Sequence, residues 1–402
     1  MNIKNNIIYI VLAAFTTLLF ADRFMVYGIV LLVMLYFFCY GKNLVLYRST
    51  LFYVFIAIFA VTLIAEVLSF TGFSIIYNAS VDRKEIYRAI IYIIVMELMM
   101  TMEVDMKAYS GIWRILLFFI VGVAIIQFTK VFDIDSILKN IYGDSVQFYN
   151  SAKTELSTFR CGSVFINPNV FACFLVAALA SYLFLIRYKY ETVAMKIITF
   201  GMIITGFVLS GSRTGLTLAV IIILTYMYNS SGGNIVIFVR NIIFLIVGIV
   251  VVLGILVMFF NVQLPDFSTF RMFKIQDGTN DSIGNKIDIF INLLRNMNVV
   301  NMIIGYGPFN YASDSRLMVD FDFGYFATFY GLTGVFIYIA LLRGIYKWGD
   351  IELSGRMILN RMFMLITIFF GITAGVYFNL RIFAIYMLMF LPIIRADEEA
   401  IA

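Results

Sequence analysis

The chain has 402 residues, of which 62% are hydrophobic and 13% are charged. A soluble domain is about half apolar and about a quarter charged, so this composition excludes an ordinary soluble protein and predicts one that lies in the lipid bilayer. The net charge of +5 is small and the basic residues are scattered, which argues against nucleic acid as a partner. Histidine is absent and Cys39, Cys161 and Cys173 are isolated, so we predict packing roles for the cysteines and no metal site.

Apolar runs of about the length of a membrane helix follow one another along the whole chain. The first run lacks the small-residue cleavage site of a signal peptide, so we expect a retained helix there. No repeat or linker divides the chain, which predicts a single integral membrane domain over residues 1–402. The predicted fold is an all-α polytopic membrane protein. Its transmembrane helices number about twelve, at residues 7–20, 24–40, 50–70, 86–102, 112–132, 164–186, 195–210, 214–229, 235–260, 323–342, 357–379 and 381–395.

Two connections are long, at about residues 133–163 and 261–321. Both contain apolar residues at helical spacing, which predicts short amphipathic helices at a membrane face. Most Lys and Arg residues of the short loops fall on the side that the two termini share, so we expect cytoplasmic termini and external long loops. The opposite short loops carry fewer basic residues, namely Arg23, Arg83, Lys84, Arg88, Arg213 and Arg381.

The first polar cluster begins at Arg160 and leads into the sixth apolar run. Pro168 suits the first turn of a helix and Asn167 suits a cap. Asn167 and Asn169 are therefore either capping residues or ligands of a substrate. Arg160 is harder to explain by capping, because it stands at the membrane edge, where the phosphate oxygens of a lipid-linked substrate would lie.

The second cluster is Ser210-Gly211-Ser212-Arg213-Thr214-Gly215, which predicts a tight turn between two apolar helices. Its small residues, including the candidate ligand Ser212, let the backbone approach a substrate closely. Arg213 has no acidic neighbour in the sequence. Its guanidinium either extends to lipid head groups or binds a phosphate group through two hydrogen bonds.

The third cluster lies in and after the second long loop. Glycines, aromatic residues that stack on sugar rings, carboxylates that accept from hydroxyls and basic residues occur together there, which is typical of a carbohydrate site. Ordinary solvated loop residues are the alternative. The candidates are Arg271, Lys286, Gly305, Gly307, Tyr311, Asp320, Asp322 and Tyr325.

Motifs of soluble enzymes are missing: the sequence has no P-loop, dinucleotide fingerprint or GxSxG elbow. Asp320-Phe321-Asp322 has the spacing of a carboxylate pair that holds a sugar nucleotide through a metal. We expect this pair outside the cell, where sugar nucleotides are not available. The sequence therefore favours a sugar donor that is already linked to a membrane lipid, with no cofactor.

The order of the three clusters resembles the O-antigen polymerase and ligase superfamily, which includes the Wzy-like polymerases. The resemblance covers roughly residues 155–340. It implies a GT-C-like, metal-independent glycosyltransferase of the bacterial cytoplasmic membrane. Such an enzyme acts at the outer face on undecaprenyl-diphosphate-linked oligosaccharides, with a flippase and a chain-length regulator as partners. The matching motifs are Arg160-x-Gly162, Asn167-Pro168-Asn169, Ser210 to Gly215, Gly305-x-Gly307, Asp322-x-Gly324-Tyr325 and Gly331-x-x-Gly334.

The ligase branch of this superfamily carries a histidine before the late helix, whereas this chain has none and offers Asp322 there. The resemblance therefore favours a polymerase that transfers the growing glycan to a hydroxyl of the next lipid-linked repeat. Arg160, Arg213 and Arg271 would contact the diphosphate, and Asp322 would orient or deprotonate the acceptor. A ligase and a lipid-linked oligosaccharide flippase are the alternatives. A flippase should show polar residues along a central path and related halves.

Overall fold

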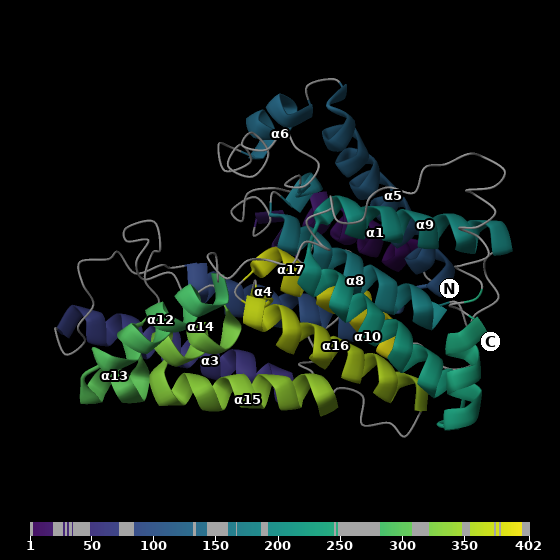
Figure 1. The fold of residues 1–402 in the computed structure, drawn as a ribbon. Helices are drawn as coiled ribbons and strands as arrows, with labels where there is room; N and C mark the ends of the chain where they lie inside the picture. The colour runs from purple at the N-terminus through teal and green to yellow at the C-terminus, as the bar shows by residue number, and fades with distance from the viewer. Residues whose placement is uncertain are drawn as a thin grey trace.

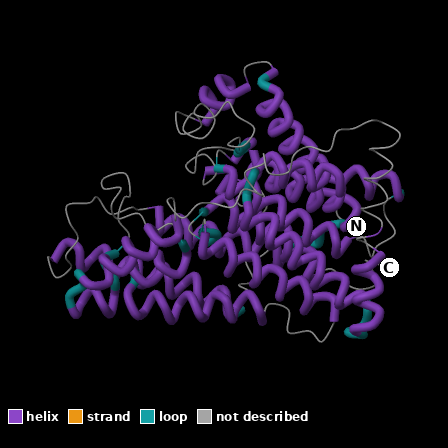
Figure 2. Tube along the Cα trace, in the orientation of Figure 1, coloured by secondary structure: helices purple, strands orange, loops and turns teal. Residues whose placement is uncertain are grey.

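A computed structural model gives the arrangement of the chain (Figure 1). Every element in the described part is a helix, and no strand occurs there (Figure 2). The all-α prediction is therefore confirmed. The structure describes residues 3–18, 49–71, 84–131, 134–142, 160–165, 167–185, 192–244, 282–307, 321–347, 354–373, 375–377 and 379–395, together with 27, 28, 30, 31, 34 and 247.

Most predicted apolar runs that lie in the described residues are helices with shifted ends, whereas the runs predicted at 24–40 and 235–260 lie in large part outside those residues. In the first part of the chain the described elements are α1 (Ile3–Leu18), α3 (Thr50–Thr71), α4 (Lys84–Thr101), α5 (Met106–Thr129), α6 (Ile134–Tyr142), the 3-10 turn η3 (Ser163–Phe165), α8 (Pro168–Leu185), α9 (Val193–Ser210) and α10 (Arg213–Ser230). In the last part they are α12 (Ser282–Arg295), α13 (Val299–Ile304), α14 (Asp322–Phe329), α15 (Gly331–Lys347), α16 (Ser354–Thr373) and α17 (Leu380–Arg395).

Local capping explains where some of the helices begin. α5 starts six residues before the predicted run, because the Asp105 side chain accepts from the Lys107 N–H and caps the helix. α8 starts four residues after the predicted position, because η3 precedes it and Pro168 occupies the first helical position. Helices α6 and α12 confirm that both long connections contain helical segments with an apolar stripe.

The run predicted as one helix over residues 323–342 is two helices, α14 and α15. Gly331 begins α15 with φ of +60°, a left-handed conformation that favours glycine. A Cβ added at Gly331 would lie 2.6 Å from the backbone nitrogen of Gly305. Tyr306 N–H donates to Thr328 O, and Gly307 N–H donates to Phe329 O. The chain breaks because the loop backbone packs directly against it there.

Replacing Gly305 with Ala should remove much of the folded protein. Gly305 has φ of 79° and ψ of −174°, a region that only glycine adopts readily, and strain there costs about 1–3 kcal/mol. A Cβ would also lie 2.2 Å from the Phe329 carbonyl carbon. Abundance and melting temperature in detergent measure the loss. Gly111→Ala is the control, because its added Cβ would have no atom within 4 Å beyond its chain neighbours and the nearby backbone of its own helix. Equal stability of the two variants would contradict the close approach.

Helices α8 and α17 form the centre of the fold, and nearly all their side chains are buried. Pro392 lies inside α17 and has no N–H, so the carbonyl of Leu388 lacks its donor within the helix. The Tyr9 hydroxyl of α1 donates to that carbonyl at 2.7 Å, and Trp113 Nε1 of α5 donates to Tyr9 at 2.7 Å. Neighbouring helices therefore satisfy the backbone group that the proline leaves unpaired.

Two side-chain contacts define the two ends of the bundle between which α1 runs. At one end, which we call the Asp105 end, the N–H of Asp105 donates to Asn6 Oδ1, so the beginnings of α1 and α5 lie together. At the other end, called the Arg160 end, Arg381 at the beginning of α17 donates to the carbonyl of Thr17 near the end of α1. Helices α1 and α5 therefore begin at the same end of the bundle, and α17 begins at the opposite end.

Two described helices, Met106–Thr129 and Val193–Ser210, are long and apolar enough to cross a membrane. Six further apolar helices in the described ranges are shorter. By this measure the predicted number of transmembrane helices is not confirmed. Large apolar side chains are nevertheless exposed on several helices, such as Val193 (73%) and Ile197 (67%) on α9 and Phe336 (65%) on α15.

Candidate functional site

The backbone around Arg160 is fixed against the ends of two helices. The Cys161 N–H donates to Leu209 O at 2.9 Å, which joins this segment to the end of α9. The Ser163 hydroxyl donates to Ile120 O of α5 at 2.6 Å. Cys161 is fully buried, and this burial raises the pKa of its thiol. Its thiol is therefore protonated and unreactive near neutral pH, in agreement with a packing role.

The first and second polar clusters meet at this point. Arg160 Nη2 donates to Asn169 Oδ1 at 2.6 Å, and Arg160 Nε donates to Ser210 O at 3.3 Å. Ser212 Oγ donates to the same Asn169 oxygen at 3.3 Å. Residues about forty apart in the sequence therefore hold one guanidinium in a fixed orientation. Such preorganised cations are suited to a phosphate group.

Ser212 also caps α10, because its Oγ accepts from the Gly215 N–H at 3.3 Å. This helix begins at Arg213, which directly follows Ser212 in the chain. The Arg213 side chain is exposed. A Cβ added at Gly215 would lie 2.7 Å from Ala172 Cβ, so this glycine brings α10 close to α8. The N-terminus of α10 adds the partial positive charge of its unpaired N–H groups.

Asn167 has the capping role that was one of its two predicted readings. Its Oδ1 accepts from the Asn169 N–H at 2.8 Å at the start of α8. Asn169 instead points its own oxygen at Arg160 and Ser212. The two asparagines of the motif therefore differ: Asn167 shapes the helix start, and Asn169 positions the arginine.

Arg381 is a second arginine at the Arg160 end, and it lies outside the three polar clusters of the sequence. Its Nη1 donates to Val164 O at 2.9 Å, and its guanidinium lies 4.4 Å from the centre of the Phe165 ring. These contacts connect the beginning of α17 to the turn that follows Arg160. The available signal was its place among the basic residues of the outer short loops.

Arg88 and Tyr325 form a buried pair between α4 and α14. Arg88 Nη1 donates to the Tyr325 hydroxyl at 2.8 Å, and only 9% of the Arg88 side chain is exposed. Tyr325 is 1% exposed, so it has little surface for a sugar ring to stack on. Its contact with Arg88 gives it a role in packing these helices. Arg88 was also counted on an outer loop but was not predicted as a site residue.

Asp322 is fully buried, and its carboxylate binds backbone N–H groups of the turn between α16 and α17. Its Oδ2 accepts from the Val376 N–H at 2.8 Å, and both its oxygens accept from the Tyr377 N–H at 3.0 and 3.1 Å. It does not cap its own helix, whose N-cap residue is Phe321. This geometry holds the turn between α16 and α17 and does not present the carboxylate to an acceptor hydroxyl. The acceptor-side role of Asp322 stays a prediction that this geometry does not favour.

The remaining predicted residues fall into three groups. Gly305 and Gly307 lie in the loop that packs against the break between α14 and α15, and they act there through their backbone. Lys286 lies on α12, and its side chain is outside the described part of the structure. Three candidates lie outside the described residues altogether, namely Arg271, Tyr311 and Asp320.

The Asp322 contacts and the Arg160 segment both lie beside the turn between α16 and α17. Val376 and Tyr377 bind Asp322, while Arg381, a few residues later, binds the segment after Arg160. The described part of the chain contains no group of three or more acidic, cysteine or histidine side chains that is arranged to hold a metal ion. A comparison with protein-family models gave no match, and a comparison with characterised protein sequences gave none either.

Proposed function

We propose that this protein is an integral membrane glycosyltransferase that polymerises lipid-linked oligosaccharide repeat units. The membrane location is supported by composition, by the two long apolar helices and by the large apolar side chains exposed on α9 and α15. Exposure of such apolar surface to water is unfavourable, whereas contact with lipid acyl chains is not. The outer face of a bacterial cytoplasmic membrane is the proposed site of reaction.

The observation that carries the proposal is the fixed guanidinium of Arg160 beside the start of α10. In the proposed reaction, an acceptor hydroxyl oxygen forms a bond to the anomeric carbon of the donor glycan. The bond from that carbon to the diphosphate oxygen breaks, and the diphosphate leaves with the electron pair. The hydroxyl proton passes to a base or to solvent. Negative charge therefore grows on the diphosphate, where oriented cations stabilise the transition state most.

The described residues divide this work. Arg160, held by Asn169 and Ser210, would contact the leaving diphosphate, and Arg213 would contact it from the first turn of α10. Arg381 and Asp322 would act indirectly, by holding the α16–α17 turn against the Arg160 segment. The undecaprenyl chain of the substrate would lie along apolar helix surface.

The proposal is tested by reconstituting the purified chain in vesicles with undecaprenyl-diphosphate-linked repeat units, and in a parallel sample with these units and lipid A-core. A ladder of products that differ by one repeat is expected. Transfer of the glycan to lipid A-core and to no repeat unit would identify a ligase instead. Movement of the lipid-linked repeat across the vesicle without any ladder would identify a flippase.

Replacing Arg213 with Lys should lower polymer formation roughly ten- to a hundredfold in the same assay. Lys keeps the charge but loses the planar fork of donors, and a charge-assisted hydrogen bond contributes about 1.5–3 kcal/mol. The measurement is the amount and length of polymer that equal amounts of vesicle-embedded wild-type and variant protein form. A control is Arg343→Lys, an exposed arginine on α15. If Arg213→Lys polymerises like the control, Arg213 only contacts lipid head groups.

A further inference from the structure

The segment that begins at Arg160 runs along one face of α5, in the direction opposite to the helix. Ser163 Oγ donates to Ile120 O at 2.6 Å. Two residues earlier in the segment, Cys161 Sγ donates to Ala124 O at 3.3 Å, one turn further along α5. The helix face that continues beyond Ala124 therefore lies beside the start of the segment, where Arg160 stands.

Gln127 is the next residue on that face, three positions after Ala124. Its side chain is 2% exposed, and its Nε2 donates to Asp135 Oδ1 at 3.2 Å. Its own oxygen, Oε1, is buried and accepts no hydrogen bond from the described residues. The amide group is therefore held between α5 and α6, with one N–H directed at the carboxylate.

Asp135 lies in the first turn of α6, and its side chain is half-buried. Burial raises the pKa of the Cys161 thiol, and the negative charge of Asp135 raises it further. The Asp135 carboxylate is therefore near the residue that directly follows Arg160. A carboxylate has about four acceptor positions, of which the bond from Gln127 takes one, so it can also accept from a substrate hydroxyl.

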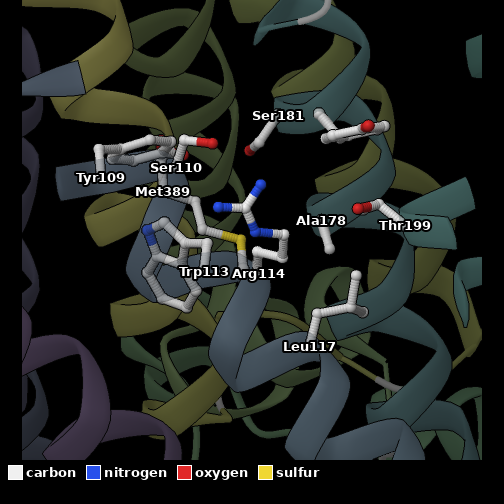
Figure 3. A pocket seen from close by; sticks show the side chains of 10 residues that line it. Tyr109, Ser110, Trp113, Arg114, Leu117, Ala178, Ser181, Thr199 and Met389 are labelled. Atoms are coloured by element: carbon white, nitrogen blue, oxygen red, sulfur yellow. The ribbon is translucent and has the colours of Figure 1, made fainter. Parts of the chain in front are cut away.

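Polar side chains nearer the other end of α5 bind within the fold. Figure 3 shows this region, which lies between α5, α8, α9 and α17. Ser181 is hydrogen-bonded to Tyr109, and the Thr199 hydroxyl donates to Met195 O at 2.9 Å. These contacts belong to helix packing, whereas the pair on α5 and α6 borders the candidate site.

The two charges beside the segment are held from different sides. Asn169 of α8 and Ser210 of α9 orient the Arg160 guanidinium, whereas α5 and α6 hold the Asp135 carboxylate. In a direct displacement at an anomeric carbon, the base stands on the face of the sugar ring opposite to the leaving group. A cation and a carboxylate on different sides of one segment fit that requirement. Asp322 does not, because its oxygens bind buried backbone N–H groups.

We propose that Asp135 is the general base of the polymerisation and that Gln127 positions it, an inference that rests on the proposed polymerase function. A hydroxyl is a weak nucleophile until a base takes its proton. As the hydroxyl oxygen forms its bond to the anomeric carbon, the proton passes to an Asp135 oxygen. The bond from that carbon to the diphosphate oxygen breaks, and the electron pair leaves with the diphosphate beside Arg160. Release of the proton to solvent then restores the carboxylate.

Asp135→Asn is the direct test, in the full chain reconstituted with undecaprenyl-diphosphate-linked repeats. Asn keeps an acceptor oxygen for Gln127 but does not take a proton at neutral pH. The initial rate of ladder formation should fall at least roughly a hundredfold, with an unchanged melting temperature. Asp288→Asn removes an exposed carboxylate on α12 and should polymerise at the wild-type rate.

Binding of undecaprenyl diphosphate, which carries no sugar, measures the leaving-group side separately. Its affinity should be the same for wild type and Asp135→Asn, and lower for Arg160→Lys. Gln127→Met keeps a similar volume but removes the N–H that holds Asp135. This variant should lower the rate roughly tenfold at unchanged affinity for undecaprenyl diphosphate.

The outcomes separate this assignment from the polymerase proposal. A wild-type ladder that Asp135→Asn forms at the same rate would overturn the role of Asp135 and leave the polymerase standing. Equal losses of turnover and of undecaprenyl diphosphate binding in Asp135→Asn would also overturn it, because a purely structural residue would affect both. A wild-type chain that forms no ladder would overturn the polymerase, and the assignment of its base with it.

Discussion

Replacing Arg160 with Lys is expected to lower the rate of glycan polymerisation by roughly 10²–10³-fold. Two donor atoms of the guanidinium bind Asn169 Oδ1 and Ser210 O, and these contacts fix its plane. A lysine ammonium is a single point of charge and cannot keep that orientation. If the fixed cation stabilises the leaving diphosphate, the loss falls on turnover rather than on the amount of protein.

The measurement is the initial rate of ladder formation at saturating lipid-linked repeat, normalised to vesicle-embedded protein. Arg343→Lys again serves as the matched control. A second variant, Asn169→Ala, removes the acceptor that orients Arg160 and should lower the turnover in the same direction. Wild-type turnover in Arg160→Lys would remove Arg160 from the site. A lower melting temperature with normal turnover would assign it a purely structural role.

Replacing Asp322 with Ala is expected to destabilise the fold by about 3–6 kcal/mol. The substitution leaves the buried N–H groups of Val376 and Tyr377 without their acceptor, and each charge-assisted hydrogen bond contributes about 1.5–3 kcal/mol. That is a large part of the stability of a typical protein, so little folded protein should reach the membrane. Asp322→Asn keeps one acceptor oxygen and should give an intermediate loss.

The melting temperature in detergent and the rate of polymerisation separate two roles for Asp322. An anchoring role predicts that stability falls from Asp to Asn to Ala and that activity follows the amount of folded protein. A role in acceptor deprotonation predicts that Asp322→Asn stays folded but inactive, because an amide does not take a proton at neutral pH. Asp288→Ala, an exposed carboxylate on α12, is the control for loss of charge alone. A stable, inactive Asp322→Asn variant would contradict the anchoring role.

Hydrophobic periodicity and length were enough to predict the all-α fold and most helices. Turn chemistry was visible too, since Pro168 begins α8 and the predicted turn at Gly211 separates α9 from α10. The break between α14 and α15 was missed. The run there is continuously apolar, and the reason for the break lies in a loop some 25 residues earlier, where Gly305 packs against Gly331. Local patterns carry no information about such a distant backbone contact.

For the same reason, the sequence predicted several residues of the candidate site but not the contacts between them. The sequence by itself identified Arg160, Asn169 and Ser212, because polar residues between apolar runs stand out against a chain that is 62% hydrophobic. Only the tertiary structure showed that one asparagine oxygen joins both motifs. It likewise separated Asp322 from them: the sequence reports a carboxylate near a helix start, but the backbone amides that surround it come from a turn 54 residues later. Burial and hydrogen-bond partners depend on which helices meet, and that is decided by packing of whole apolar faces rather than by any motif.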